Sequence, residues 1–169
     1  ESIICRWGLI QKELKKHKTE FIPVDSEHFS IWSVISGHSN SDIEKIILTA
    51  SGGPFLNKSI KKNITPSDAI NHPNWEMGKK ISVDSATLMN KIFEIIEAKK
   101  IFDIELKKFY ILIHPKSYIH AIVKFKNGLI KIVAHDTNMK IPISNSIYMG
   151  ERTRNFIKSK KIDLTILNS

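Results

Sequence analysis

The sequence predicts an α/β (α+β) fold in which helices pack on a mixed sheet that includes an antiparallel hairpin. Short apolar runs that suit strands alternate with segments whose apolar residues recur at helical spacing. Two apolar runs flank Lys-Asn-Gly at 126–128, which is typical of a hairpin turn because glycine tolerates positive φ. The 169 residues are enough for one domain with its own core.

The first part of the chain is expected to form two helices joined by a short strand. Residues 2–18 and 26–35 repeat apolar side chains at helical spacing. The apolar run 21–24 between them predicts a strand that delivers Asp25 at its end. Ser26 is the expected N-cap of the second helix, because a side-chain oxygen there can accept from free backbone N–H groups.

The middle of the chain combines a buried strand, a turn and a polar stretch. A short helical turn over 39–44 precedes an apolar strand over 46–50, which ends in the glycine-rich turn 51–55. Residues 56–77 are polar and irregular except for a short helix near 65–68, where threonine before proline suits a helix N-terminus.

The second half is expected to supply the longest helix and most of the sheet. A short strand over 81–83 precedes a helix over 85–101. Three further strands are expected, the last two forming the hairpin: 109–114, 118–125 and 129–134. From Ile143 onward the chain becomes helical and then basic.

The composition is that of a globular chain with a surplus of lysine. Hydrophobic residues make up 41% and charged residues 25%, and the formal net charge is +9. A solvated lysine-rich surface is the ordinary explanation, and a basic αβ module that binds nucleic acid or other anions is the alternative. No stretch approaches the roughly 18 consecutive apolar residues of a membrane span. Cys5 is the single cysteine, so nothing indicates an oxidising compartment.

Two polar clusters indicate chemistry. Asp25 and Glu27 lie two residues apart at a predicted helix start, and Glu94 shares one side of a helix with Asn90 and Lys91. Carboxylates from two segments can hold a divalent cation, and the neighbouring polar groups can hold a phosphate. This suggests metal-assisted chemistry on a small phosphorylated substrate. The alternatives are helix-capping carboxylates in the first cluster and an exposed Lys91–Glu94 ion pair in the second.

Two loops are further candidates. Ser51 with the glycines that follow it could approach a phosphate, although an ordinary tight turn has the same composition. Trp75 and Met77 stand on a polar loop, where they either anchor the loop to the core or form a lid that excludes water. For the histidines outside this loop a structural role is the default expectation: His28, His114 and His120.

Taken together, these motifs closely resemble the 1-deoxy-D-xylulose 5-phosphate reductoisomerases. They are Pro-Val-Asp-Ser-Glu-His (23–28), Thr-Ala-Ser-Gly-Gly-Pro-Phe (49–55), His-Pro-Asn-Trp (72–75), Met-Gly-Lys-Lys-Ile-Ser-Val-Asp-Ser-Ala-Thr-Leu-Met-Asn-Lys (77–91), Glu94, and Leu-Ile-His-Pro-Lys-Ser (112–117). Each motif is modest, but their ordered combination is specific and extends to about Pro142. This ordered combination disfavours the alternative that the chain is a different metal-dependent sugar-phosphate enzyme. Two positions depart from the family pattern. Ile92 stands where the family often has glycine, and Met149-Gly150 stands where Trp-Pro is common.

The resemblance implies an enzyme of non-mevalonate isoprenoid biosynthesis. It would rearrange 1-deoxy-D-xylulose 5-phosphate and reduce it with NADPH to 2-C-methyl-D-erythritol 4-phosphate. Mg²⁺ or Mn²⁺ would be bound by Asp25, Glu27 and Glu94. The implied substrate residues are Ser26, Ser51, His72, Trp75, Ser85, Asn90, Lys91 and Glu94. The implied catalytic residues are Glu27, His28 and His114, and the implied cofactor contacts are Met77 and Gly78.

The resemblance also sets expectations for the whole protein. Residues 1–150 would form a catalytic metal- and substrate-binding domain, and 151–169 a linker toward a missing C-terminal helical domain. The NADPH-binding domain of the family would precede the chain, so we expect the chain alone to be inactive. Its partners would be a sugar phosphate and a second copy in a homodimer, with no nucleic acid and no membrane. We expect a bacterial cytoplasmic protein, or a plastid one in a plastid-bearing eukaryote.

Overall fold

Four strands form one mixed sheet in the order β2-β1-β3-β4. The computed structural model describes residues 1–56, 63–72 and 75–148. The strands are β1 (Ile43–Ala50), β2 (Phe109–Ile113), β3 (Ile119–Phe125) and β4 (Ile130–Ala134). β2 pairs parallel with β1, whereas β1–β3 and β3–β4 are antiparallel. The predicted hairpin joins β3 and β4, with Gly128 at a φ of 87°.

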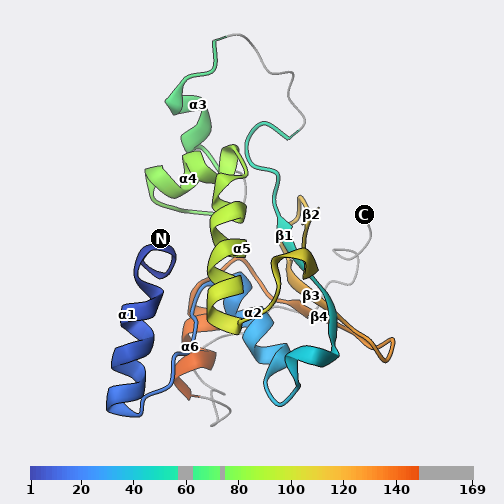
Figure 1. The fold of residues 1–169 in the computed structure, drawn as a ribbon. Coiled ribbons are helices and arrows are strands. Elements are labelled where there is room, and N and C mark those ends of the chain that lie inside the picture. Colours follow the sequence, from blue (N-terminus) through green and yellow to red (C-terminus); the bar gives the residue numbers. More distant parts are fainter. Residues whose placement is uncertain (57–62, 73–74, 149–169) are drawn as a thin grey trace.

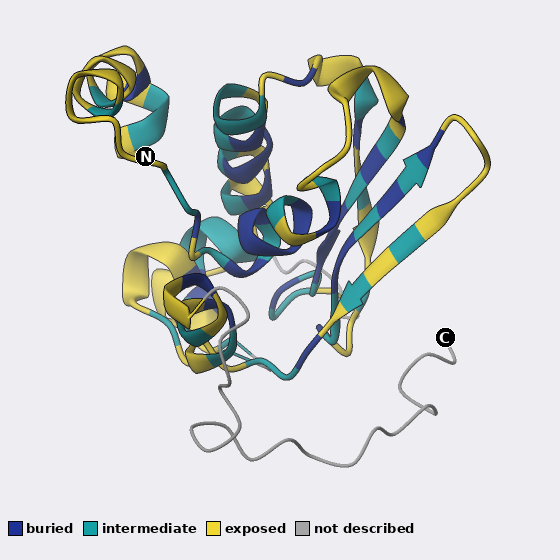
Figure 2. Cartoon of the chain, turned by 90° about the horizontal axis from the view of Figure 1, so that it is seen from below, coloured by how far each residue is buried: buried dark blue, intermediate teal, exposed yellow. Residues whose placement is uncertain are grey.

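Two helices cover one face of this sheet. α2 (Ser26–Ile35) and α5 (Met89–Phe102) pack on the same side (Figure 1). Because side chains alternate along a strand, Ile46 and Leu48 point toward these helices while Ile47 points away. Figure 2 shows the buried residues gathered between helices and sheet. The core consists of Ile31, Val34, Ile43, Ile46, Leu48, Ile95, Ala98, Ile104, Phe109, Ala121, Val123 and Phe125.

The remaining helices surround this core. α1 lies against α5, α3 and α4 pack together beside the N-terminal end of α5, and α6 contacts α2 (Figure 1). Their bounds are α1 (Ser2–His17), α3 (Pro66–Ile70), α4 (Lys79–Ala86) and α6 (Lys140–Tyr148), with short 3₁₀ turns at Asn40–Asp42 and Leu106–Lys108. Within the described part of the chain, no helix combines the length and apolarity that crossing a bilayer requires.

Two predicted strands are wrong. Residues 21–24 pair with no strand and lead directly into α2. The N-cap of α2 is Asp25 rather than Ser26, because the Asp25 side chain accepts from two backbone N–H groups. Residues 81–83 lie inside α4, where the buried Ser82 donates a 3.2 Å hydrogen bond to the Gly78 carbonyl one turn earlier. A three-residue apolar pattern is too short to distinguish a strand from a buried helix segment.

The helix predicted over 85–101 is divided by a sharp turn. α4 ends at Ala86 and α5 begins at Met89, with Leu88 between them in the left-handed region at a φ of 60°. A left-handed backbone is costly for a residue with a side chain, so periodicity alone does not predict it. The turn brings Ser85 on α4 and Lys91 on α5 to one cavity. The other predicted elements are confirmed within a few residues, except beyond Tyr148, because 149–169 lie outside the described residues.

The loop after β1 approaches α4 closely enough to need glycine. Gly53 has a φ of +69°, and a Cβ there would lie 3.0 Å from the Ala86 Cα and 3.1 Å from the Ser85 carbonyl oxygen. This contact fixes the end of β1 beside the end of α4. Gly8 in α1 has open space around its Cα, with nothing within 4 Å of an added Cβ.

Gly53→Ala should therefore destabilise the chain, whereas Gly8→Ala should not. We expect Gly53→Ala to lower the free energy of unfolding by about 1–3 kcal/mol, through backbone strain and the clash with α4. Gly8→Ala should be neutral or stabilising by up to about 1 kcal/mol, because alanine restricts the unfolded chain. Urea denaturation of both variants checks this, and equal effects at the two positions would contradict it.

Candidate functional site

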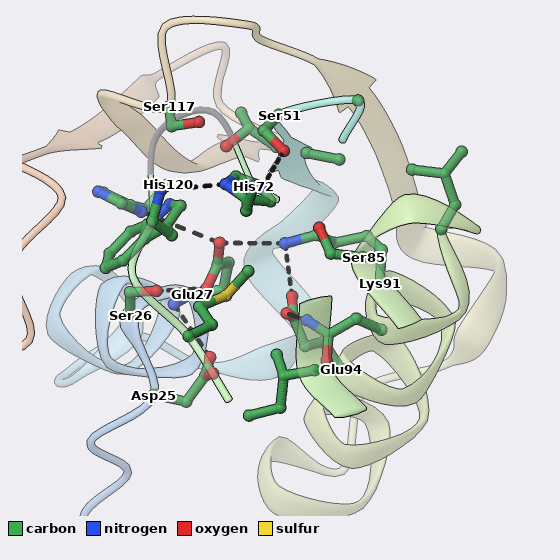
Figure 3. Close-up of a pocket in the computed structure, with 18 of the residues that line it drawn as sticks. Asp25, Ser26, Glu27, Ser51, His72, Ser85, Lys91, Glu94, Ser117 and His120 are labelled. Atoms are coloured by element: carbon green, nitrogen blue, oxygen red, sulfur yellow. Dashed lines mark hydrogen bonds and ion pairs between the residues drawn. The ribbon is translucent and has the colours of Figure 1, made fainter. Parts of the chain in front are cut away.

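A cavity of about 420 Å³ opens where the end of β1, α4, α5 and the loop at 75–78 meet. Its wall contains every residue predicted from the sequence to bind substrate, metal or cofactor. These residues are Asp25, Ser26, Glu27, Ser51, His72, Trp75, Met77, Gly78, Ser85, Asn90, Lys91 and Glu94. Figure 3 shows the labelled members pointing toward one another. The fold thus gathers residues that are spread over 70 positions of the sequence.

Three carboxylates converge in this cavity. One oxygen each from Asp25, Glu27 and Glu94 lies within 4.8 Å of the other two. The Glu94 and Glu27 side chains are 7% and 12% exposed, whereas Asp25 lies at the rim with 44%. Among the described residues no other group of acidic, histidine or cysteine side chains has this metal-binding geometry. Hard oxygen ligands in this number suit Mg²⁺ or Mn²⁺.

Asp25 both starts α2 and faces the cavity. Its Oδ1 accepts hydrogen bonds of 3.1 Å from the backbone N–H groups of Glu27 and His28. The capping interpretation of Asp25 is therefore correct, but it does not exclude a metal role, because the cap engages one of two carboxylate oxygens. The cap also fixes Glu27 at the first turn of the helix.

Lys91 connects the two acidic segments. Its Nζ lies 3.0 Å from Glu27 Oε1 and 2.6 Å from Glu94 Oε2. Lys91 is only 6% exposed. Burial opposes its charge, but the two carboxylates outweigh burial and raise the pKa of Lys91. The alternative of an exposed Lys91–Glu94 ion pair is wrong, because both side chains are buried.

The two carboxylates beside Lys91 hold their protons differently. Burial opposes the ionisation of Glu27, but Lys91, His120 and Ser26 outweigh it and hold the pKa of Glu27 well below its usual range. Burial and the neighbouring charge of Glu27 raise the pKa of Glu94 well above its usual range. Ionising all three carboxylates would exceed what Lys91 can neutralise, so Glu94 favours its protonated form, and a bound divalent ion would favour the ionised one.

Ser51 and His72 link the end of β1 to the loop above it. Ser51 Oγ lies 2.8 Å from His72 Nε2 and accepts from the Gly53 N–H at 3.1 Å. The Trp75 N–H donates to His72 Nδ1 at 3.0 Å, so Nε2 carries the ring hydrogen and donates to Ser51. Burial lowers the pKa of His72, which favours this neutral ring. The hydroxyl hydrogen of Ser51 then remains for a bound anion.

The structure adds residues that the sequence did not single out. His120, treated as structural by default, lines the cavity with its Nδ1 3.9 Å from Glu27 Oε1. Ser117 and Met139 also line it. The position of His120 follows from strand pairing, because the start of β3 lies beside the end of the antiparallel β1. That pairing could have indicated His120 once the sheet order was known.

Two predicted catalytic histidines do not line this cavity. His28 is 2% exposed behind the carboxylates, and its Nε2 lies 2.8 Å from the backbone oxygen of Glu94, so it donates there. It thereby joins α2 to α5. His114 follows β2, where its N–H donates to the Ala50 oxygen at 2.8 Å. The pKa of His114 is lowered mainly by burial and, to a smaller extent, by the neighbouring His120 and Lys116. Their catalytic roles stay predictions.

Comparison with known proteins gives one consistent match. Residues 21–102 match the family model described as 1-deoxy-D-xylulose 5-phosphate reductoisomerase C-terminal domain. A curated reductoisomerase from Pelagibacter ubique is 64% identical over all of this chain and 44% of its own length. One from Wolbachia of Drosophila simulans is 47% identical over 98% of this chain and 42% of its own length.

Solved structures agree with the sequence comparison. A reductoisomerase in complex with NADPH, fosmidomycin and magnesium has a TM-score of 0.87 and 39% identity, over all of this chain and 44% of that one. The Zymomonas mobilis enzyme with NADPH has a TM-score of 0.85 and 38% identity, over 99% of this chain and 43% of that one. The chain therefore spans less than half the length of the relatives it matches.

The raised pKa of Glu94 predicts that this residue destabilises the metal-free chain at neutral pH. When folding raises a pKa, the stability gained is present at low pH and is lost as pH rises from the usual carboxyl pKa of 4.5 through the raised one. We expect Glu94→Gln, measured with a chelator present, to stabilise the chain at neutral pH by about 0.5–2 kcal/mol. The gain should shrink as pH falls toward 4.5.

Urea denaturation at two pH values measures this difference. The matched control is Glu13→Gln on α1, where the side chain is 63% exposed, and it should stay within about 0.5 kcal/mol at both pH values. A loss of stability in Glu94→Gln at neutral pH would show that the Lys91–Glu94 pair more than offsets the burial of the charge.

Proposed function

The chain belongs to the 1-deoxy-D-xylulose 5-phosphate reductoisomerase family, and we propose that it forms the metal- and substrate-binding part of such an enzyme. The proposed reaction is metal-dependent rearrangement of 1-deoxy-D-xylulose 5-phosphate and its reduction by NADPH to 2-C-methyl-D-erythritol 4-phosphate. One observation carries the proposal. Three carboxylates from α2 and α5 meet in a cavity that also presents hydroxyl, amide and ammonium groups.

The carboxylates fit a divalent cation by their chemistry. Asp25, Glu27 and Glu94 would hold Mg²⁺ or Mn²⁺, because such ions prefer carboxylate oxygens and the raised pKa of Glu94 marks unneutralised charge. When bound, the ion supplies Lewis acidity to a carbonyl of the substrate. NADPH supplies the hydride, and Met77 and Gly78 in the cavity wall are the proposed contacts to it.

The polar groups of the cavity suit a phosphate. Ser51, Ser85 and Asn90 line the wall from three different segments. In the structure Lys91 forms ion pairs with both Glu27 and Glu94. Once these carboxylates bind a cation, the Lys91 ammonium becomes available to a phosphate. Binding the phosphate away from the reacting carbons orients the substrate for the rearrangement.

Apolar side chains complete the cavity and limit water. Trp75, Ile81, Leu88 and Met139 contribute to its wall alongside the polar residues. The Trp75 and His120 rings also meet in an edge-on arrangement, with their centroids 6.0 Å apart. A lid that carries Trp75 would exclude water when substrate is bound, which strengthens every charge interaction inside. Residues 73 and 74 of this loop lie outside the described residues.

The open face of the sheet suits a homodimer interface. Tyr110, Ile47, Ile122 and Ile132 form one row across the four strands, in register. Their neighbours Leu112 and Ile130 are 49% and 54% exposed. No described helix packs on this face (Figure 2). Such a broad exposed apolar surface is typical of an interaction site. The bacterial cytoplasmic location and the domain boundary at 150 stay predictions.

The reaction is tested in a full-length enzyme that carries this chain. We expect oxidation of NADPH that needs both 1-deoxy-D-xylulose 5-phosphate and Mg²⁺ or Mn²⁺. Glu94→Gln should lower kcat about 100-fold or more, since metal stabilisation of developing charge is worth several kcal/mol. Glu13→Gln should leave kcat unchanged. Full activity in Glu94→Gln, or turnover by this chain alone, would contradict the proposal.

The dimer is tested by light scattering after size exclusion. The parent should have twice the chain mass, and Ile132→Asp should be monomeric, because a buried unpaired carboxylate is costly. Leu9→Asp is the matched control. Leu9 is 52% exposed and Ile132 is 55% exposed, but Leu9 lies on α1, away from the sheet. A monomeric parent, or a dimeric Ile132→Asp, would rule out this interface.

A further inference from the structure

His120 is fixed at one ring nitrogen by the main chain. Its side chain is buried, with 1% exposure of the residue. Nε2 lies 3.1 Å from the His135 backbone oxygen. A carbonyl only accepts, so Nε2 carries the hydrogen, and Nδ1 is the atom that faces Glu27 Oε1 at 3.9 Å. One hydrogen bond places a hydrogen on Nε2 but leaves the ring plane free to turn about that contact.

The side chain of His135 fixes the ring plane. The His120 and His135 rings stack with centroids 3.7 Å apart and planes 19° apart. His135 directly follows β4, and its N–H donates to the Tyr118 oxygen at 3.0 Å, which holds it beside the start of β3. His135 is itself 8% exposed, so the stack lies inside the protein.

His135 is suited to support a ring rather than to exchange protons. Its Nδ1 lies 2.8 Å from the Asp136 backbone oxygen and donates to it. Burial, and then the neighbouring His120, lower the pKa of His135 to about 4, so the ring is neutral at neutral pH. Its Nε2 is buried with no hydrogen-bond partner in the described part of the chain. The flat face of the ring is therefore what His135 offers to His120.

We propose that His135 is a positioning residue, which stacks on His120 and so keeps the Nδ1 of His120 directed at Glu27. The proposal rests on the proposed function, in which Glu27 is a metal ligand. His135 lies outside all of the motifs that carry the family resemblance. It acts through His120 and touches neither the carboxylates nor the phosphate groups.

The kinetic test compares two variants in the full-length enzyme that carries this chain. His135→Ala removes the stacking face, so the His120 ring can turn, and we expect kcat to fall about tenfold or more, since small misplacements near the chemistry are costly. KM should change less than about twofold, because the phosphate contacts are untouched. His135→Phe keeps a flat ring and should restore most of kcat.

The matched control is His38→Ala. The His38 ring packs against Phe125 of the same sheet, with centroids 4.6 Å apart and planes 43° apart, and does not line the cavity. It should leave kcat unchanged. The proposal is overturned if His135→Ala keeps its kcat, or if His135→Phe loses as much as His135→Ala, because the ring nitrogens would then matter rather than the stack.

A second readout needs no turnover. Long-range ¹⁵N–¹H spectra of this chain should show sharp His120 ring signals, with a hydrogen on Nε2, in the parent and in His135→Phe. In His135→Ala these signals should broaden. Unchanged His120 signals in His135→Ala overturn the positioning role whatever the activity. If these signals broaden in His135→Ala but the full-length parent enzyme has no turnover, the proposed function is refuted and the positioning role stands.

Discussion

The buried ammonium of Lys91 joins the two halves of this site, and the rest of the arrangement depends on it. Glu27 on α2 and Glu94 on α5 lie 67 positions apart in the sequence, and each forms an ion pair with the same Nζ. Removing Lys91 would leave two buried carboxylates without their cation, and such a loss typically costs about 3–5 kcal/mol. One ammonium cannot neutralise three carboxylates, however. Ionising all three would therefore leave surplus negative charge, which a bound divalent cation would neutralise.

The fold positions the carboxylates and Lys91 because the ends of several helices and strands meet at the cavity. β1 ends at Ala50, β3 begins beside it, and Gly53 brings the following loop against α4. The left-handed Leu88 then turns the chain so that α5 can present Lys91 and Glu94 to the same cavity. The core that holds these ends in place lies on one face of the sheet, which leaves the other face exposed.

Much of this was predictable from the sequence, and the failures have physical causes. The residues predicted to bind substrate and metal all line one cavity. The resemblance of the ordered motifs to one family implied most of these roles, and residue chemistry alone indicated the carboxylate clusters. The prediction of a strand at 81–83 is wrong because these residues belong to a helix, and helix packing buries Ser82. The break at Leu88 is a costly conformation that only tertiary contacts explain. His120 and His135 were missed as site residues, since their stack depends on the antiparallel pairing of β3 and β4.

The central claim is that carboxylates from two distant segments share one divalent cation. A calorimetric titration of this chain with Mn²⁺, beside Asp25→Asn, Glu94→Gln and the exposed control Glu13→Gln, tests it most directly. The account predicts one site per chain, retained in Glu13→Gln and lost in both cavity variants. Binding that is unchanged in Asp25→Asn and Glu94→Gln would mean that these carboxylates only cap and support helices, and the metal site would have to be abandoned.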